Sequence, residues 1–268
     1  MLSRLADFLP HPLSAWVAHA RNRASHLETR RDVTHVGEEI RDALDRMDDP
    51  PDIQPPRPAE TGPEYRYTLR DFDRLDCIFV HVPKAAGISL ATALFGHLGG
   101  GHRTVREYRR IFGWDFDRYF VFTVVRNPFS RLVSAWRFMR GELPIFRLNR
   151  HYRDTVLARY DGFGDFVRSE LETAAAERVA FRPQTHFLCA DGRLDVDYVG
   201  KVETLQRDFE RIRDELDVDA SLSHRNRSPG PRRPVESWFT DQTADIARSV
   251  YERDFDVLGY GREVPGRV

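Results

Sequence analysis

Residues 77–98 read C-I-F-V-H-V-P-K-A-A-G-I-S-L-A-T-A-L-F-G-H-L, and this stretch decides the fold. Four of its first six residues are apolar, and Pro83 follows them, which predicts a short buried strand. Apolar residues recur at helical spacing from Ile88 onward, so a helix should come next. Between the two lies a tight loop of small residues, 83–89, with a single charge at Lys84. A strand, a loop and a helix in this order predict a site for an anion.

The loop has the chemistry that a phosphate or sulfate group requires. A helix begins with unpaired N–H groups and a partial positive charge, which a preceding loop can direct at one anion. Gly87 lets the backbone approach closely, Lys84 adds a full charge, and Ser89 adds a hydroxyl group. Only two of the 41 basic residues are lysines, Lys84 and Lys201. A lysine in the loop of such an arginine-rich chain indicates that this position requires a compact ammonium group. The alternative is an ordinary strand-to-helix turn with a solvated lysine.

The loop differs from the ATP-binding P-loop sequence G-x-x-x-x-G-K-[ST]. That pattern places the lysine directly before the hydroxyl residue, whereas Lys84 precedes Ser89 by five positions. ATP is therefore not the first expectation for the ligand.

A second strand and helix carry the next polar residues. Residues 119–125, Y-F-V-F-T-V-V, predict another buried strand, and Arg126 follows it directly. Asn127 suits the N-cap of a helix and Pro128 its first position, so a helix should run to about residue 140. Ligands of open α/β sheets bind at the carboxyl ends of the strands, which is where Arg126 is expected to lie.

The predicted helix after Arg126 has two distinct faces. Its core stripe consists of Leu132, Trp136 and Met139. Another face carries Arg131, Ser134 and Phe138. This arrangement should place Ser134 within reach of an anion held by Arg126.

The two stretches resemble the donor-binding motifs of sulfotransferases. P-K-A-A-G-I-S at 83–89 is similar to the 5′-phosphosulfate loop of that family, and R-N-P-F-S-R-L-V-S-A-W at 126–136 is similar to its 3′-phosphate motif. The likeness is greatest to carbohydrate sulfotransferases of the Golgi type and their bacterial relatives. It extends through Y-V-G-K-V-E-T-L at 198–205 and Y-E-R-D-F-D-V-L-G-Y at 251–260, so it covers roughly residues 75–260.

The resemblance implies a fold and a reaction. The fold is α/β, a P-loop nucleotide-kinase-like fold with a mainly parallel central sheet flanked by helices. The reaction is transfer of a sulfuryl group from 3′-phosphoadenosine-5′-phosphosulfate (PAPS) to a hydroxyl group of an acceptor, with a carbohydrate or glycoconjugate as the expected acceptor. The resemblance places Lys84 in catalysis, beside the oxygen that bridges sulfur and phosphorus. It assigns donor binding to Lys84, Ala85, Ala86, Gly87, Ile88, Ser89, Arg126, Ser134, Arg225 and Arg227.

Two histidines compete for the role of general base. In the resembling family a histidine between the two donor motifs serves some members in this role, and His102 matches that interval best. It follows the glycine loop 99–101, and Thr104 starts a capping box for the next predicted helix. His186, in R-P-Q-T-H at 182–186, is the rival, since such a Pro-Gln segment lies near the acceptor in similar proteins. An ordinary surface histidine is the alternative for His102.

Three further interpretations bear on the donor and on metals. A P-loop kinase shares the strand, loop and helix, and it would need ATP, Mg²⁺ and an acidic metal ligand; a nucleotide-binding module without turnover would lack the base. Metal ions are not expected, because a sulfuryl group carries fewer negative charges than a phosphoryl group and a lysine with loop amides could replace Mg²⁺. The D-x-D pair at 195–197 is explained better as a polar hairpin start than as a glycosyltransferase metal site.

The chain divides into one catalytic domain and an N-terminal extension. With 268 residues and 41% hydrophobic content, residues 65–268 can bury one core, and a net charge of −1 does not favour nucleic acid as a partner. Residues 48–64 hold six prolines and predict a stiff linker. Residues 1–47 show two apolar helical stripes, which predict a helical extension packed on the domain; alternatively, these helices could mediate oligomerisation or contact a membrane surface.

The cysteines and the hydropathy favour a cytoplasmic protein. Cys77 and Cys189 lie in apolar runs, so buried free thiols are expected rather than a disulfide. No run approaches the ~18 apolar residues of a membrane span, and polar residues and prolines interrupt the N-terminus where a signal peptide would be apolar. The expected cytoplasmic location departs from the Golgi-type relatives, which carry a membrane anchor.

Overall fold

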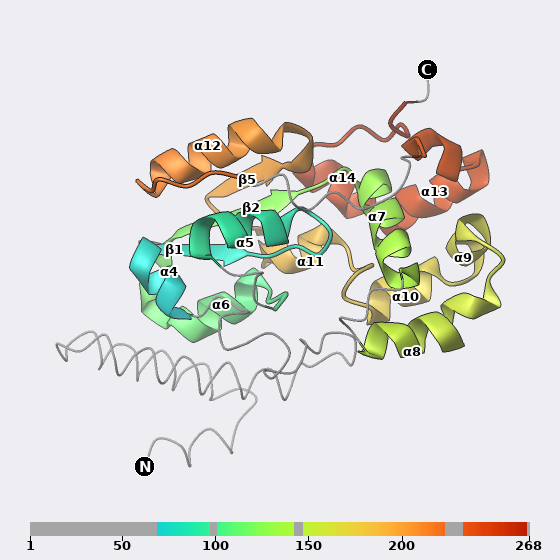
Figure 1. Cartoon of the computed structure of the whole chain (residues 1–268), viewed down its shortest axis with the longest axis horizontal. Helices are drawn as coiled ribbons and strands as arrows, with labels where there is room; N and C mark the ends of the chain where they lie inside the picture. The colour runs from blue at the N-terminus through green and yellow to red at the C-terminus, as the bar shows by residue number, and fades with distance from the viewer. Residues whose placement is uncertain (1–68, 97–100, 142–146, 223–232, 267–268) are drawn as a thin grey trace, which may run out of the picture.

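The computed structural model describes residues 69–96, 101–141, 147–222 and 233–266 (Figure 1). The expected N-terminal extension and linker lie outside these residues, as do Arg225 and Arg227. The strands are β1 (Cys77–Val80), β2 (Phe120–Val125), β3 (Cys189–Ala190), β4 (Arg193–Leu194) and β5 (Tyr198–Lys201). The helices are α4 (Leu69–Leu75), α5 (Gly87–Phe95), α6 (Val105–Phe112), α7 (Pro128–Arg140), α8 (Arg147–Thr155), α9 (Phe163–Ser169), α10 (Leu171–Glu177), α11 (Gln184–Leu188), α12 (Leu205–Glu215), α13 (Asp241–Val250) and α14 (Glu252–Leu258).

A parallel sheet with the order β1-β2-β5 forms the centre of the fold. Helices flank it, with α5 and α12 running alongside the strands in Figure 1. The expected α/β class with a parallel central sheet is therefore confirmed. β3 and β4 form a separate antiparallel hairpin whose turn is at Asp191 and Gly192, as the Asp-Gly pair predicts.

The register of the sheet brings three chain segments to one edge. Val80 pairs with Thr123, and Val125 pairs with Lys201, so the three strands end close together. The loop that begins at Pro83 follows β1, Arg126 follows β2, and Glu203 follows β5. Because the strands are parallel, these segments share the carboxyl edge, where α/β sheets bind ligands.

Two apolar cores support this edge. One lies around the sheet with α4, α5 and α6, and its members include Phe79, Phe122 and Phe209. The other joins α7 to α9, α10 and α13, which Figure 1 shows on the side away from α4. The predicted stripe of Leu132, Trp136 and Met139 is buried in this second core. The helix α7, which carries the expected 3′-phosphate motif, is therefore packed on its apolar face against α9, α10 and α13.

Several local predictions are confirmed by hydrogen bonds at helix starts. The side chain of Asn127 accepts hydrogen bonds from the backbone N–H groups of Phe129 and Ser130, and Pro128 is the first residue of α7. Thr104 and Glu107 form the expected capping box of α6.

Both cysteines are buried free thiols. No helix in the described part of the chain is long and apolar enough to span a bilayer.

Other predictions need correction. Arg131 is buried, although the helical pattern placed it on a face away from the core stripe. Its guanidinium reaches backbone carbonyls of other segments, which helical spacing cannot reveal. The sequence predicts a strand that ends at Glu203, whereas this residue lies in a 3₁₀ turn after β5. The sequence also predicts that Thr240 caps a last helix; Thr240 does cap α13, but α14 begins directly after Tyr251.

The acidic pair at 195–197 has structural contacts. The carboxylate of Asp195 accepts two hydrogen bonds from Arg109, at 2.7 Å and 2.6 Å. Asp197 accepts a hydrogen bond from the N–H group of Val121 at 2.8 Å. Asp195 thus joins the end of the hairpin to α6, and Asp197 joins the start of β5 to β2, in line with the interpretation of this pair as structural.

Candidate active site

The loop after β1 has the backbone geometry of an anion cradle. Lys84 and Ala86 both adopt positive φ angles, 66° and 61°, in the left-handed region. Each such non-glycine residue costs about 1–2 kcal/mol. The first backbone bonds of α5 run from Ser89 N and Leu90 N to Ala86 O, so the N–H group of Gly87 precedes the helical ladder. Alternating backbone conformations of this kind form concave sites for anions.

Gly87 is required because an imidazole fills the space beside it. A Cβ atom at this position would overlap the ring of His81, which is buried at the end of β1 and stacks on Phe79. The remaining loop residues have different exposures: Ala85 is buried, Ala86 and Ser89 are half-buried, and Ile88 is 44% exposed. Gly87 therefore lets the loop fold tightly over the strand end, and the approach of its backbone to an anion stays a prediction.

Lys84 points towards α7. Its Nζ atom lies 3.7 Å from the centre of the Phe138 ring, a distance typical of a cation–π interaction. Burial, together with the charges of Arg126 and Arg131, lowers the pKa of Lys84 to about 8. Because this environment disfavours the ammonium form of Lys84, a negatively charged ligand beside it would stabilise that form and raise the pKa.

The structure brings Lys84, Arg126 and Ser134 to one place. Ser134 is half-buried and lies one turn before Phe138, so it shares the face of α7 that Lys84 approaches. Arg126 is also half-buried and acts on the pKa of Lys84 through its charge. These three residues come from two motifs more than 40 positions apart in the sequence. Lys84 of the loop thus lies near the second motif, and the donor-binding roles of Arg126 and Ser134 stay predictions.

His102 lies beside the same strand end. Its Nδ1 atom is 2.9 Å from the carbonyl oxygen of His81, and the two rings are 4.5 Å apart. A carbonyl can only accept, so Nδ1 of His102 carries the proton and Nε2 keeps its lone pair. Burial and the charge of Lys84 lower the pKa of His102, and the hydrogen bond to His81 offsets part of this effect. The resulting pKa is about 4. The imidazole is therefore neutral at pH 7 and can accept a proton at Nε2.

His186 has a different electrostatic environment. It is half-buried on α11, and burial lowers its pKa to about 4, with added effects of Arg182 and Arg106. The charge of Lys84 acts on His102, whereas Arg182 and Arg106 act on His186. The contact between Nδ1 of His102 and His81 O places His102 beside the strand that leads into the loop with Lys84.

Gln184 fixes the backbone of Arg126. The side-chain oxygen of Gln184 accepts a hydrogen bond from Arg126 N at 2.9 Å, and its amide nitrogen donates to Arg126 O at 2.7 Å. Gln184 is itself held by Asp254, whose carboxylate accepts from the N–H groups of Gln184 and Thr185 at 2.7 Å and 2.8 Å. Both Gln184 and Asp254 are fully buried. The position of Arg126 is therefore set by α11 and α14.

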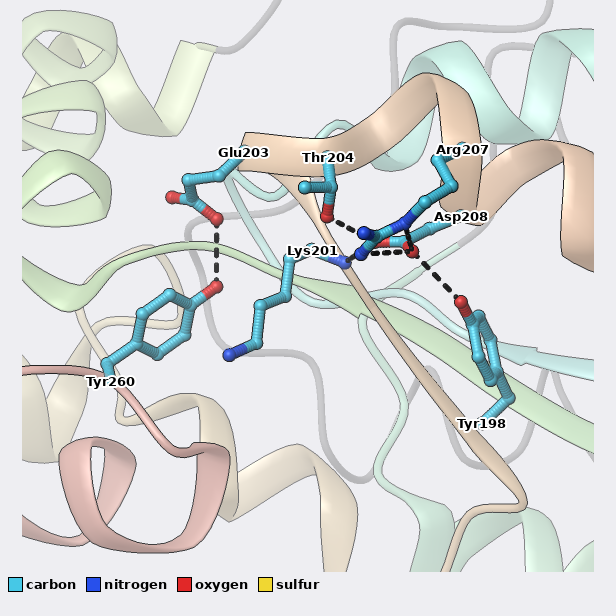
Figure 2. A network of polar contacts seen from close by, with 7 residues as sticks. All are labelled: Tyr198, Lys201, Glu203, Thr204, Arg207, Asp208 and Tyr260. Carbon is cyan, nitrogen blue, oxygen red and sulfur yellow. Dashed lines mark hydrogen bonds and ion pairs between the residues drawn. The ribbon is translucent and has the colours of Figure 1, made fainter.

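Glu203 holds the next residue in the same way. One carboxylate oxygen accepts a hydrogen bond from Asn127 N at 2.8 Å, and the other accepts from the hydroxyl of Tyr260 at 2.9 Å. Figure 2 shows Tyr260 pointing at Glu203, with Lys201 beside it. Burial and the charge of Glu203 raise the pKa of Tyr260 well above its usual range. The hydroxyl thus stays protonated and donates to Glu203.

Asp208 stabilises the turn that presents Glu203. Its carboxylate accepts hydrogen bonds from Lys201 N at 2.8 Å, from the Thr204 hydroxyl at 2.6 Å and from the Tyr198 hydroxyl at 3.1 Å (Figure 2). Burial alone would raise the pKa of Asp208, but these hydrogen bonds outweigh it and hold the pKa below its usual value. The turn between β5 and α12 is therefore fixed as a unit.

Comparison with protein families matches residues 72–261 to the Sulfotransferase family. The chain belongs to the sulfotransferase family. Carbohydrate sulfotransferase 12 of Mus musculus is 28% identical over 205 residues, which cover 61% of this chain and 47% of the relative. Carbohydrate sulfotransferase 10 of Xenopus laevis is 29% identical over 170 residues, which cover 54% of this chain and 48% of the relative. The chain thus spans about half the length of the curated relatives it matches, and no solved structure matches it.

The two weaker stretches of sulfotransferase likeness now have physical roles. The stretch at 198–205 contains Glu203, and the stretch at 251–260 contains Asp254 and Tyr260. Glu203 contacts Asn127 directly, Asp254 acts on Arg126 through Gln184, and Tyr260 acts on Asn127 through Glu203. Apart from the family resemblance, no residue pattern predicts these partners. The role of Gln184 was missed, because the R-P-Q-T-H segment suggested only proximity to the acceptor.

Proposed function

We propose that this chain transfers a sulfuryl group from PAPS to a hydroxyl group of a carbohydrate. The observation that carries the proposal is the convergence of Lys84, Arg126 and Ser134 at one carboxyl edge, around a loop shaped for an anion. A donor with an anionic group at each end requires two such groups of residues. Membership of the sulfotransferase family supports the same reaction class.

In this proposal Lys84 stabilises the leaving group. As the bond between sulfur and the bridging oxygen breaks, negative charge grows on that oxygen, and an ammonium beside it stabilises the transition state more than the ground state. The N-terminus of α5 alone contributes about 0.3–1 kcal/mol, or up to about 2 kcal/mol when partly buried. The lysine must therefore supply the larger share.

His102 takes the proton of the acceptor hydroxyl at Nε2. The hydroxyl oxygen forms the new bond to sulfur while the bond to the bridging oxygen breaks, and adenosine 3′,5′-bisphosphate leaves with the bonding electrons. The hydrogen bond from Nδ1 to His81 O keeps Nε2 as the accepting atom and orients the ring. Bound donor adds negative charge near His102, which raises its pKa towards a value useful for a base at neutral pH.

Arg126 and Ser134 bind the 3′-phosphate of the donor. Gln184 and Glu203 hold the backbone at Arg126 from two sides, so the guanidinium starts from a fixed base. Charge-assisted hydrogen bonds of this kind contribute about 1.5–3 kcal/mol each. In this proposal Lys84 and the loop amides supply the positive charge near the transferred group. Independence from metal ions stays a prediction.

A carbohydrate acceptor is proposed from the relatives, whose names describe carbohydrate sulfotransferases. Oligomerisation or membrane contact through residues 1–47, the donor role of Arg225 and Arg227, and a cytoplasmic location stay predictions from the sequence.

Calorimetric titration and a transfer assay test the proposal. Adenosine 3′,5′-bisphosphate should bind, and ATP should bind more weakly, with or without Mg²⁺. Transfer of labelled sulfate from PAPS to a panel of glycans should then identify the acceptor. Tight, Mg²⁺-dependent ATP binding would instead support a P-loop kinase. Nucleotide binding without transfer to any glycan of the panel would favour a binding module or a different acceptor class.

A further inference from the structure

Arg131 is a buried charge that the proposed mechanism leaves unused. It lies on α7 with only 1% of its surface exposed. Its Nε atom donates a hydrogen bond to Pro83 O at 2.9 Å, and Nη2 donates to Arg182 O at 2.7 Å and to Ala180 O at 3.4 Å. A single guanidinium therefore joins three segments: the start of the loop at 83–89, here called the anion loop, the helix that follows Arg126, and the segment before α11.

These contacts require an arginine. Burying a charge is unfavourable unless hydrogen bonds compensate, and a planar fork can donate to several carbonyls in fixed directions, which a lysine cannot. Within the described residues each hydrogen bond of Arg131 ends on a backbone carbonyl, and Asp254 acts on it only through space. The contact thus fixes backbone positions and does not depend on the identity of the side chains it joins.

The placement of Arg131 matters because the two halves of the site lie on different elements. The loop with Lys84 follows β1, and Arg126 precedes α7; Pro83 O and the side chain of Arg131 form a direct link between them. The charge of Arg131 also acts on Lys84 and on His102, which places it next to the proposed catalytic pair. A change at Arg131 would therefore alter the separation of the two halves without touching the donor.

We propose that Arg131 is a positioning residue that sets the distance between the anion loop and the Arg126 end of α7, so that both anionic ends of the donor bind at once. This inference rests on the proposed function. A ligand held at two ends gains affinity because the second contact is intramolecular, and that gain is lost when the geometry no longer matches. Ligands with one phosphate need no such match.

Calorimetry with two ligands tests the inference. The affinity ratio of adenosine 3′,5′-bisphosphate to adenosine 5′-monophosphate measures the gain from the second phosphate. In Arg131→Lys, which keeps the charge but not the fork, this ratio should fall by about tenfold or more, whereas affinity for the monophosphate should change less. Arg140→Lys is the matched control, because Arg140 lies on the same helix, is exposed and packs over Trp136. Its ratio should equal that of the wild type.

The outcomes separate the inference from the proposed function. Equal losses for both ligands in Arg131→Lys would mean a purely structural role and would overturn the inference alone. A wild-type protein with no preference for the 3′-phosphate would overturn the proposed donor and the inference together.

Hydrogen exchange of the wild-type protein provides a second measurement if Arg131→Lys does not fold. Adenosine 3′-monophosphate should slow exchange at 126–130 and also in the loop at 84–89, with adenosine alone as the baseline. Unchanged exchange in the loop would overturn the inference.

Discussion

The pKa of Lys84 leads to a specific prediction for the pH dependence of donor binding. In the free protein burial, Arg126 and Arg131 lower this pKa from 10.5 to about 8. In the proposed function the ammonium form of Lys84 binds the anionic donor, and the neutral form binds it weakly. Because the folded, ligand-free pKa is depressed, the binding form is fully present below pH 8 and is lost as the pH rises through that value. Bound donor adds negative charge beside Lys84, so the pKa in the complex is higher.

The size of the effect follows from linkage between proton and ligand. Between the pKa of the free protein and that of the complex, donor affinity should fall by about tenfold for each pH unit. If the donor restores the ordinary lysine pKa, the shift from about 8 back to 10.5 corresponds to roughly 3 kcal/mol. Half of Lys84 is already neutral at pH 8, so between pH 8 and pH 9.5 the affinity of the wild type should fall by roughly 15-fold.

Calorimetric titration of adenosine 3′,5′-bisphosphate from pH 6.5 to 9.5 measures this fall, and sulfate transfer from labelled PAPS measures the rate. Lys84→Ala should abolish the alkaline loss of affinity and lower kcat by ~10²–10³, by analogy with the loss of one oxyanion donor. Lys84→Arg should keep its affinity at pH 9.5 but restore kcat poorly, because a planar guanidinium cannot replace a compact ammonium in a tight loop.

The second lysine of the chain is the control for this experiment. Lys201→Arg should retain the alkaline loss, because the titrating group is still present. The reasoning would be refuted by an alkaline loss that persists in Lys84→Arg, or by near-normal sulfate transfer in a folded Lys84→Ala protein.

Four further substitutions test individual contacts of the site. Arg126→Ala should weaken binding of adenosine 3′,5′-bisphosphate by about tenfold or more, with little effect on adenosine 5′-monophosphate, as calorimetry can show; equal losses for both ligands would contradict its role. His102→Ala should lower kcat by ~10²–10⁴ with near-normal donor affinity, and an unchanged rate would exclude it as the base. Gly87→Ala should lower the free energy of unfolding by about 1–3 kcal/mol in denaturant titration, because the new methyl group overlaps the ring of His81; His81→Ala in the same chain should recover the loss. Glu203→Ala should cost about 1–3 kcal/mol by leaving Asn127 N without its buried acceptor, and Glu203→Gln, which keeps an accepting oxygen, should cost less. Equal unfolding free energies for the two Glu203 variants would refute that contact.

The parts of the fold that sequence predicts best depend on near neighbours. The cap at Asn127, the capping box of Thr104 and Glu107, and the turn at Asp191 each involve residues within four positions of one another. Short-range contacts of this kind leave a recognisable residue pattern. The anion loop belongs to the same class, because Gly87 and the helix start follow Lys84 directly, and the lysine stands out by its rarity in an arginine-rich chain.

Arg131 shows where such reasoning fails. Helical spacing set it apart from the apolar stripe, and a charged residue in that position is normally solvated. Its burial depends on carbonyls at Pro83 and at 180–182, which come from segments about 50 positions away. No pattern within α7 records those acceptors, so the prediction for this residue was wrong.

Gln184 and Glu203 share a further property with Arg131: each contacts backbone atoms of the site rather than side chains. A backbone atom is the same for every residue type, so the supported position carries no trace of its support. A residue outside the motif can also affect the function of the motif. Loss of Gln184 would displace Arg126 while leaving the R-N-P motif intact, because the displacement arises outside the motif. In the proposed function the motif specifies which groups bind the donor, whereas Gln184 and Glu203, which lie 58 and 76 positions from the residues that they contact, hold the backbone at Arg126 and Asn127.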